Sequence, residues 1–203
     1  MGLGYAVAYA VGATPWERAG DVGAEQLNRL IEHEEKARGG PSRALDLGCG
    51  AGTHAVALAQ RGWRVTGVDQ INKALTRARK RADDSGTTVT FVQGDVTRLD
   101  TGTVGIGYDL LLDVGCFHGL TPTKQAAMGR SIESVAAPDA TLLMLAFKPE
   151  TTPRPLPRGA DTAAIEQALP RWRVVDTEPA PTDGMPAPLR KAAPTWYRVR
   201  RSS

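Results

Sequence analysis

The feature that most constrains the fold is the segment 44–53, which reads ALDLGCGAGT. A short apolar run ends in three glycines at alternate positions, Gly48, Gly50 and Gly52, and a helix-forming run begins at Thr53. Glycine lets a backbone turn sharply and lets a ligand approach it closely. The N-terminus of the next helix presents free N–H groups and the positive end of its dipole to such a ligand. The segment therefore predicts a buried strand, a glycine turn and a helix at a ligand site.

A second acidic signal follows one strand–helix unit later. Residues 64–69 read RVTGVD, so this strand is expected to end at Asp69. An ionised carboxylate has two acceptor oxygens and accepts hydrogen bonds from a pair of neighbouring hydroxyls. Together the glycine turn and Asp69 predict a site for a nucleotide-like cofactor that carries a ribose.

Strands and helices alternate along the chain. We expect helices at 23–38, 53–61, 72–84, 123–136 and 161–169, with Asn72 as an N-cap, and an irregular link between 97 and 107. Strands are expected at 43–47, 64–69, 88–93, 108–113, 141–147, 171–178 and 195–200. This alternation predicts an α/β fold with a doubly wound, mostly parallel seven-stranded sheet, helices on both faces and one antiparallel strand near the edge. Ligands bind beyond the carboxyl ends of such strands, so the turns after 47, 69, 93 and 113 should converge.

Length and composition favour one globular domain. The chain has 203 residues, of which 41% are hydrophobic and 23% are charged, enough to bury a sizeable core. We expect a single domain over 1–203, with an N-terminal segment and helix (1–40), a cofactor-binding core (41–147) and substrate-side loops with the last strands (148–203). The longest apolar run, 142–147, is too short to span a bilayer. Cys49 and Cys116 form neither a disulfide framework nor a metal cluster, so we expect a cytoplasmic protein without membrane contact.

The formal net charge of +3 does not by itself indicate nucleic acid. Much of the basic excess lies in the run RARKR (77–81) and in the C-terminal tail, without aromatic residues that would stack on bases. A solvated helix face is the favoured interpretation, and no obligate protein partner is evident. The proline-rich loops 148–159 and 179–194 also carry four cationic side chains, Arg154, Arg158, Arg190 and Lys191. These side chains either favour an anionic acceptor or are only solvated.

The glycine spacing separates two kinds of cofactor. A dinucleotide fingerprint would have its third glycine at position 53, which is occupied by Thr53. The pattern found, an acid followed by glycines at every second position, resembles motif I of the class I S-adenosylmethionine-dependent methyltransferases. The resemblance implies that Asp46 anchors the amino-acid part of the cofactor. It also implies a cofactor-binding turn made of Asp46, Gly48, Cys49, Gly50 and Gly52.

The next two turns agree with that cofactor. The resemblance implies that Asp69 binds the ribose hydroxyls and that Gln70 packs beside it on the adenine. The sequence Gly94-Asp95-Val96 resembles the third-strand motif, in which the acid faces the adenine amine. For each acid, a turn or helix-capping role is the alternative.

Acceptor chemistry is expected just past the fourth strand, in the stretch 113–120, which reads DVGCFHGL. Here the chain resembles the thiopurine methyltransferase and tellurite-resistance-like branch, which carries an Asp-x-x-x-Phe-His-x-Leu stretch and an earlier Thr-Pro-Trp segment, here 14–16. The resemblance spans about residues 12–147. It implies that Trp16 covers the cofactor or the substrate and that Asp113 contacts the cofactor. It further implies that Phe117 and His118 contact the acceptor. Asp113 and His118 would be the catalytic residues.

Several roles stay open at this point. His118 would serve as general base for a hydroxyl acceptor because its ordinary pKa lies near neutrality, or it would orient Asp113 or cap the next helix. Trp16 would alternatively be a core anchor. Cys116 is expected to be a packed thiol, since methyl transfer needs no covalent enzyme intermediate.

The residues and the resemblance together predict methyl transfer from S-adenosylmethionine to a sulfur or oxygen atom of a small molecule by in-line displacement. A nicotinamide-dependent oxidoreductase, which would share the fold and Asp69, and a catalytically silent cofactor-binding protein are the alternatives. Methylation of nucleic-acid bases is disfavoured, because the fourth strand is followed by DVGC and not by an Asn-Pro-Pro-Tyr-like stretch.

Overall fold

The computed structural model describes residues 24–149, 158–183 and 190–202. Trp16, with the rest of the Thr-Pro-Trp segment, lies outside the described residues, as do Arg154 and parts of both proline-rich loops. Within the described ranges, no helix is both long enough and apolar enough to cross a membrane.

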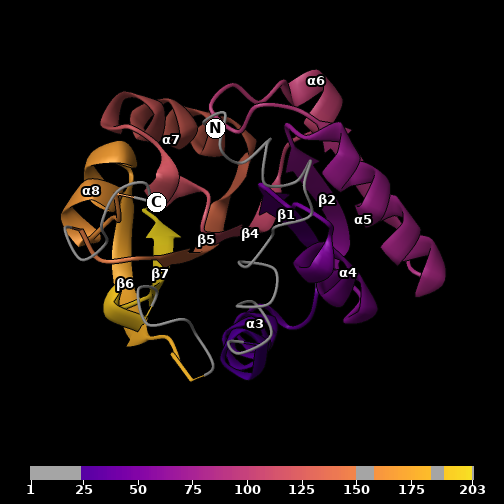
Figure 1. The fold of residues 1–203 in the computed structure, drawn as a ribbon, viewed down its shortest axis with the longest axis horizontal. Coiled ribbons are helices and arrows are strands. Elements are labelled where there is room, and N and C mark those ends of the chain that lie inside the picture. Colours follow the sequence, from indigo (N-terminus) through magenta and orange to yellow (C-terminus); the bar gives the residue numbers. More distant parts are fainter. Residues whose placement is uncertain (1–23, 150–157, 184–189, 203) are drawn as a thin grey trace.

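A seven-stranded sheet with the order β3-β2-β1-β4-β5-β7-β6 forms the centre of the molecule (Figure 1). Strands β1 to β5 pair in parallel, whereas β7 is antiparallel to both of its neighbours, β5 and β6. The antiparallel strand is therefore second from the edge, and the predicted fold class is confirmed. The strands are β1 (Arg43–Leu47), β2 (Arg64–Asp69), β3 (Val89–Gln93), β4 (Tyr108–Val114), β5 (Ala136–Ala146), β6 (Trp172–Pro179) and β7 (Thr195–Arg201).

Helices cover both faces of the sheet, and each face has its own apolar cluster. One cluster joins the sheet to α7 and α8 through residues such as Met128, Ile132 and Ile165. The other joins it to α3 and α4, through residues such as Ile31 and Leu58. Because both faces are covered, the central strands are continuous apolar runs. The helices are α3 (Ala24–Arg38), α4 (Thr53–Gln60), α5 (Asn72–Asp84), α6 (Thr101–Val104), α7 (Pro122–Val135), α8 (Thr162–Ala168) and the 3-10 helix η1 (Phe117–Gly119).

Helix α3 crosses the β5–β7 part of the sheet and is fastened at both ends. Near its N-terminus, the Gln26 side chain donates a hydrogen bond to the carbonyl of Pro179 at the end of β6. Near its C-terminus, Glu34 accepts hydrogen bonds from Thr141 on β5 and Arg198 on β7. The first turn of α3 therefore lies at the edge where the parallel strands end, which is also the edge of the glycine turn.

Three local expectations were wrong. The link 97–107 contains a short helix, α6, because Asp100 accepts the N–H of Gly102 and caps it. Strand β5 begins five residues earlier than expected, at Ala136, which pairs with Tyr108 ahead of a register shift. Asn72 is the first residue of α5 and not its N-cap, since the carbonyl of Ile71 accepts the first N–H groups of the helix.

Candidate active site

The glycine turn after β1 has the backbone that the sequence predicts. Gly48, Gly50 and Gly52 have φ angles of 76°, 53° and 77°, a region that residues with a Cβ rarely adopt. The N–H groups of Gly48 and Cys49 both donate to the carbonyl of Val68, which ties the turn to β2. A Cβ on Gly52 would lie 2.8 Å from the Cβ of Ala78, so helix α5 packs directly against the turn.

Asp69 lies at the end of β2 and organises this turn. Its carboxylate is 3% exposed and accepts the N–H of Gly50 at 3.0 Å and the N–H of Ile71 at 2.8 Å. Burial raises its pKa, and the backbone N–H groups of Ile71, Gly50 and Gln70 partly oppose that rise. Each oxygen keeps a second lone pair, so the carboxylate is able to accept two further hydrogen bonds.

Asp46, on β1, is a buried acid with one oxygen unsatisfied over the described ranges. It is 2% exposed, and its Oδ2 atom has no hydrogen-bond partner among the described residues. Burial raises its pKa to about 8, and the charges of Asp113 and Asp69 add to the rise. An acceptor atom without a partner, inside a cluster of carboxylates, fits a ligand that brings a cation or a hydrogen-bond donor.

The third turn adds a more exposed acid. Asp95 accepts the N–H and the hydroxyl of Thr97 at 2.9 Å and 2.7 Å, and its pKa is lowered although burial alone would raise it. Gln70 is only partly buried and also hydrogen-bonds to Asp95. Val96 is 3% exposed and packs in the cluster on the α7 face. The structure therefore brings the turns after β2 and β3 together, as the sequence predicts.

Asp113 supports the turn that follows β4. It has no exposed surface, and its two oxygens accept the N–H groups of Cys116 and Phe117 at 2.8 Å and 2.9 Å. Burial raises its pKa to about 7, against the opposing effect of these N–H groups. Phe117 also has no exposed surface, because its ring packs in the core with α7 and α8. A turn-forming carboxylate and a core ring do not fit the catalytic and acceptor-binding roles that the resemblance implied.

His118 is held by a partner that sequence reasoning missed. Its Nδ1 accepts the N–H of Phe147 at 2.9 Å, and its ring stacks on the Phe147 ring with centroids 4.6 Å apart. Burial lowers the pKa of His118 to about 4, so the assumption that it titrates near neutrality does not hold. Because Nδ1 is an acceptor, the proton of the neutral ring is on Nε2 and no lone pair is free for a general base. His118 instead links the ends of β4 and β5.

Replacing His118 by asparagine should make the unfolding free energy fall less steeply as the pH drops below 7. The pKa falls from 6.5 in the unfolded chain to about 4 in the folded protein, so the unfolded chain binds more protons in that window. This contribution to stability is complete above pH 6.5 and is lost as the pH falls toward 4. Asparagine keeps an acceptor for Phe147 but does not titrate. Between pH 7 and pH 5, the wild type should lose about 2 kcal/mol more unfolding free energy than His118→Asn, measured by urea unfolding. Equal losses would contradict the assignment.

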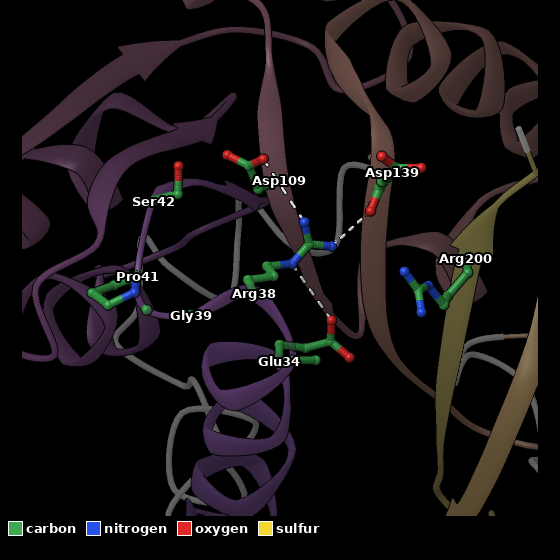
Figure 2. A pocket seen from close by; sticks show the side chains of 10 residues that line it. Glu34, Arg38, Gly39, Pro41, Ser42, Asp109, Asp139 and Arg200 are labelled. Atoms are coloured by element: carbon green, nitrogen blue, oxygen red, sulfur yellow. Dashed lines mark hydrogen bonds and ion pairs between the residues drawn. The ribbon is translucent and has the colours of Figure 1, made fainter.

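Two cavities lie outside the cluster of acids at the strand ends. One, of about 500 Å³, is at the opposite end of the sheet between the end of α3 and the starts of β4 and β5 (Figure 2). Arg38 lies at its centre, bonded to the carbonyl of Asp139 and 3.8 Å from an oxygen of Asp109. The other, of about 560 Å³, is lined by Ala51 and by polar residues of α5 and its C-terminus. Neither contains the acids at the strand ends.

Comparison with known proteins decides between the cofactors. A family model described as "Methyltransferase domain" matches residues 44–139. The 2-heptyl-1-hydroxyquinolin-4(1H)-one methyltransferase of Mycobacteroides abscessus is 30% identical over 159 residues, which cover 76% of this chain and 67% of that protein. The chain belongs to the S-adenosylmethionine-dependent methyltransferases. This membership sets aside the nicotinamide-dependent alternative.

Solved structures show the same methyltransferase fold. The 1,6-didemethyltoxoflavin-N1-methyltransferase of Burkholderia thailandensis, with bound 1,6-didemethyltoxoflavin and S-adenosylhomocysteine, gives a TM-score of 0.74 at 22% identity and covers 98% of this chain and 86% of that one. TehB from Haemophilus influenzae gives 0.63 at 15% identity, over 80% of this chain and 58% of that one. S-adenosylmethionine is the cofactor of this methyltransferase, and the unpartnered Oδ2 of Asp46 and the glycine turn fit it.

Proposed function

We propose that this methyltransferase transfers a methyl group to an oxygen or sulfur atom of a small molecule by in-line displacement. When bound, S-adenosylmethionine supplies the methyl group on a positively charged sulfur, which is a good leaving group. The protein therefore has to align the reacting atoms and exclude water, and it does not have to form a covalent intermediate.

The cofactor-binding roles follow from the acceptors at the strand ends. Asp69 has two lone pairs free for the ribose hydroxyls, and Asp46 offers Oδ2 to the amino-acid part of the cofactor. The glycines carry no side chains, so the cofactor is able to lie close to the backbone of the turn. The adenine is assigned to Gln70, Asp95 and Val96. Mutual repulsion of the buried acids Asp46, Asp69 and Asp113 favours a positively charged ligand.

One observation supports the type of acceptor: Nδ1 of His118 already accepts the N–H of Phe147, and both oxygens of the fully buried Asp113 hold backbone N–H groups of its own turn. Without a base, the acceptor atom has to ionise by its own acidity. Thiols and acidic hydroxyls do so near neutral pH, whereas alcohols do not. The Mycobacteroides relative, named for a substrate with a hydroxyl on a ring nitrogen, supports this class. The Phe117-His118 stretch and the similarity to TehB support placement in the thiopurine methyltransferase and tellurite-resistance-like branch. Trp16 as a cover over the site stays a prediction.

The test is the pH dependence of methyl transfer to a series of substituted thiophenols and N-hydroxy heteroaromatics. With a labelled methyl group on the cofactor, the midpoint of the kcat/KM profile should follow the pKa of each acceptor. His118→Asn should keep that dependence. A midpoint that stays constant across the series would reveal an enzyme base and contradict the proposal, as would the absence of transfer to every member.

A further inference from the structure

Two buried polar atoms at the carboxyl edge of the sheet have no hydrogen-bond partner in residues 24–149, 158–183 and 190–202. Trp196, at the start of β7, is 3% exposed, and its Nε1–H donor has no acceptor among the described residues. Gln26, in the first turn of α3, is 5% exposed, and its Oε1 acceptor receives no donor within the part of the chain that the structure describes. Each unpaired buried group costs about 1–3 kcal/mol, and a donor and an acceptor left unpaired together point to a ligand that supplies the complement.

The two groups are neighbours, and the orientation of the Gln26 amide is determined by its surroundings. Its Nε2 donates to Oε2 of Glu178 at 2.8 Å and to the carbonyl of Pro179 at 3.1 Å. Both partners are acceptors, so the nitrogen has to face them and the oxygen has to face away. Glu178 is the cross-strand partner of Trp196. Directly opposite residues have side chains about 5 Å apart, so Gln26 and Trp196 meet at the same strand pair.

An apolar row leads from this pair toward the glycine turn. Trp196 pairs with Leu145 on β5, and Leu145 pairs with Val114 on β4. Paired residues point to the same face, here the face covered by α3. Leu145 and Val114 are only partly buried, so the row is reachable between Trp196 and β4. Beyond Val114, the side chain of Cys116 packs against Gly48. The Cβ of Cys116 lies 3.1 Å from the position that a Cβ on Gly48 would occupy.

We propose that the acceptor lies over Val114 and Leu145 and is recognised by the Nε1–H of Trp196 and the Oε1 of Gln26. A donor beside an acceptor complements a ring carbonyl beside an N–H, as in a lactam. The distance from β4 to β7 is two strand spacings, about 10 Å, which suits a fused bicyclic ring plus one hydrogen bond. The acceptor class is therefore a planar fused heteroaromatic with a lactam-type edge. This proposal rests on the function proposed above.

The test compares Trp196→Phe with a matched control, Trp63→Phe. Both tryptophans are 3% exposed and belong to the same apolar cluster, but Trp63 donates its Nε1–H to Glu35 at 2.8 Å. The probes are quinolin-2(1H)-one, which has the lactam edge, and quinoline, which lacks it. Their affinities are measured by calorimetry on the full chain saturated with S-adenosylhomocysteine, together with the thermal unfolding temperature of each variant.

Wild type and Trp63→Phe should prefer the lactam at least 10-fold, and Trp196→Phe should lose about 10-fold in lactam affinity with quinoline unchanged. Thermal stability should fall further in Trp63→Phe than in Trp196→Phe, because both variants lose the packing of a buried indole but only Trp63→Phe also loses a hydrogen bond. The proposal is overturned if wild type shows no lactam preference, or if Trp196→Phe keeps it. A Trp196→Phe variant that is destabilised as much as Trp63→Phe and binds both probes unchanged would also overturn it, by indicating that a structural water pairs with the Trp196 donor. Lactam preference without methyl transfer to any oxygen or sulfur acceptor would instead contradict the proposed function.

Discussion

Asp69→Ala is expected to weaken S-adenosylhomocysteine binding by at least 100-fold. The proposed role gives this carboxylate two hydrogen bonds to ribose hydroxyls, and hydrogen bonds to charged groups contribute about 1.5–3 kcal/mol each. Losing both corresponds to a factor of roughly 100 or more. The substitution also frees the N–H of Gly50, so the glycine turn loses one of its supports. Calorimetric titration of S-adenosylhomocysteine measures the effect.

The matched control is Asp100→Ala. Asp100 also accepts a backbone N–H, that of Gly102, and it caps α6 outside the proposed cofactor contacts. This variant should bind S-adenosylhomocysteine with wild-type affinity. If Asp69→Ala binds as tightly as Asp100→Ala, the ribose assignment is wrong.

Glu34→Ala should have the largest effect on stability, lowering the unfolding free energy by about 3–5 kcal/mol. Glu34 is 1% exposed and holds α3 on the sheet, with Oε2 accepting the hydroxyl of Thr141 at 2.7 Å and Oε1 accepting Nε of Arg198 at 2.5 Å. Figure 2 shows Arg38 beside Glu34. The Nε of Arg38 lies 3.7 Å from Oε2 of Glu34. Burial alone would raise the pKa of Glu34, but these partners outweigh it and lower the pKa. Alanine leaves the largely buried guanidinium of Arg198 without its counter-charge and, among the described residues, leaves Arg38 with Asp109 alone.

Glu32→Ala is the control on the same helix. Glu32 pairs with Lys36 at 2.9 Å, but their side chains are 52% and 75% exposed, so solvent screens the pair. This substitution should change stability by less than about 1 kcal/mol. Urea unfolding of both variants at pH 7 gives the comparison. Similar losses in the two variants would show that the buried network does not fasten α3.

The cofactor side of the site was predictable because its signals are local. The glycine turn and Asp69 belong to consecutive strand–turn–helix units, in which spacing along the chain dictates spacing in space. The carboxyl ends of parallel strands then have to meet at one edge. The regular elements were predictable for the same reason, since apolar periodicity determines which face of each element is buried.

The acceptor side depends on contacts between residues far apart in the chain. The sequence places Asp113 and His118 in one stretch and leaves the role of His118 open, whereas in the structure Phe117 packs in the core and His118 binds the N–H of Phe147, 29 positions away. Gln26 reaches β6 over 152 positions. No local pattern marks such pairs, because they arise only when α3 packs across the last strands.

The sequence by itself therefore determined the class of fold, the glycine turn and the acids that fit S-adenosylmethionine. Only the tertiary structure decided how burial changes the pKa values and the hydrogen-bond partners of the polar groups. Burial raised the pKa of Asp46 to about 8, lowered that of His118 to about 4, and left the Trp196 donor without an acceptor among the residues that the structure describes. Desolvation depends on everything that packs around a group, so it is a property of the assembled fold and not of the residues beside it in the chain.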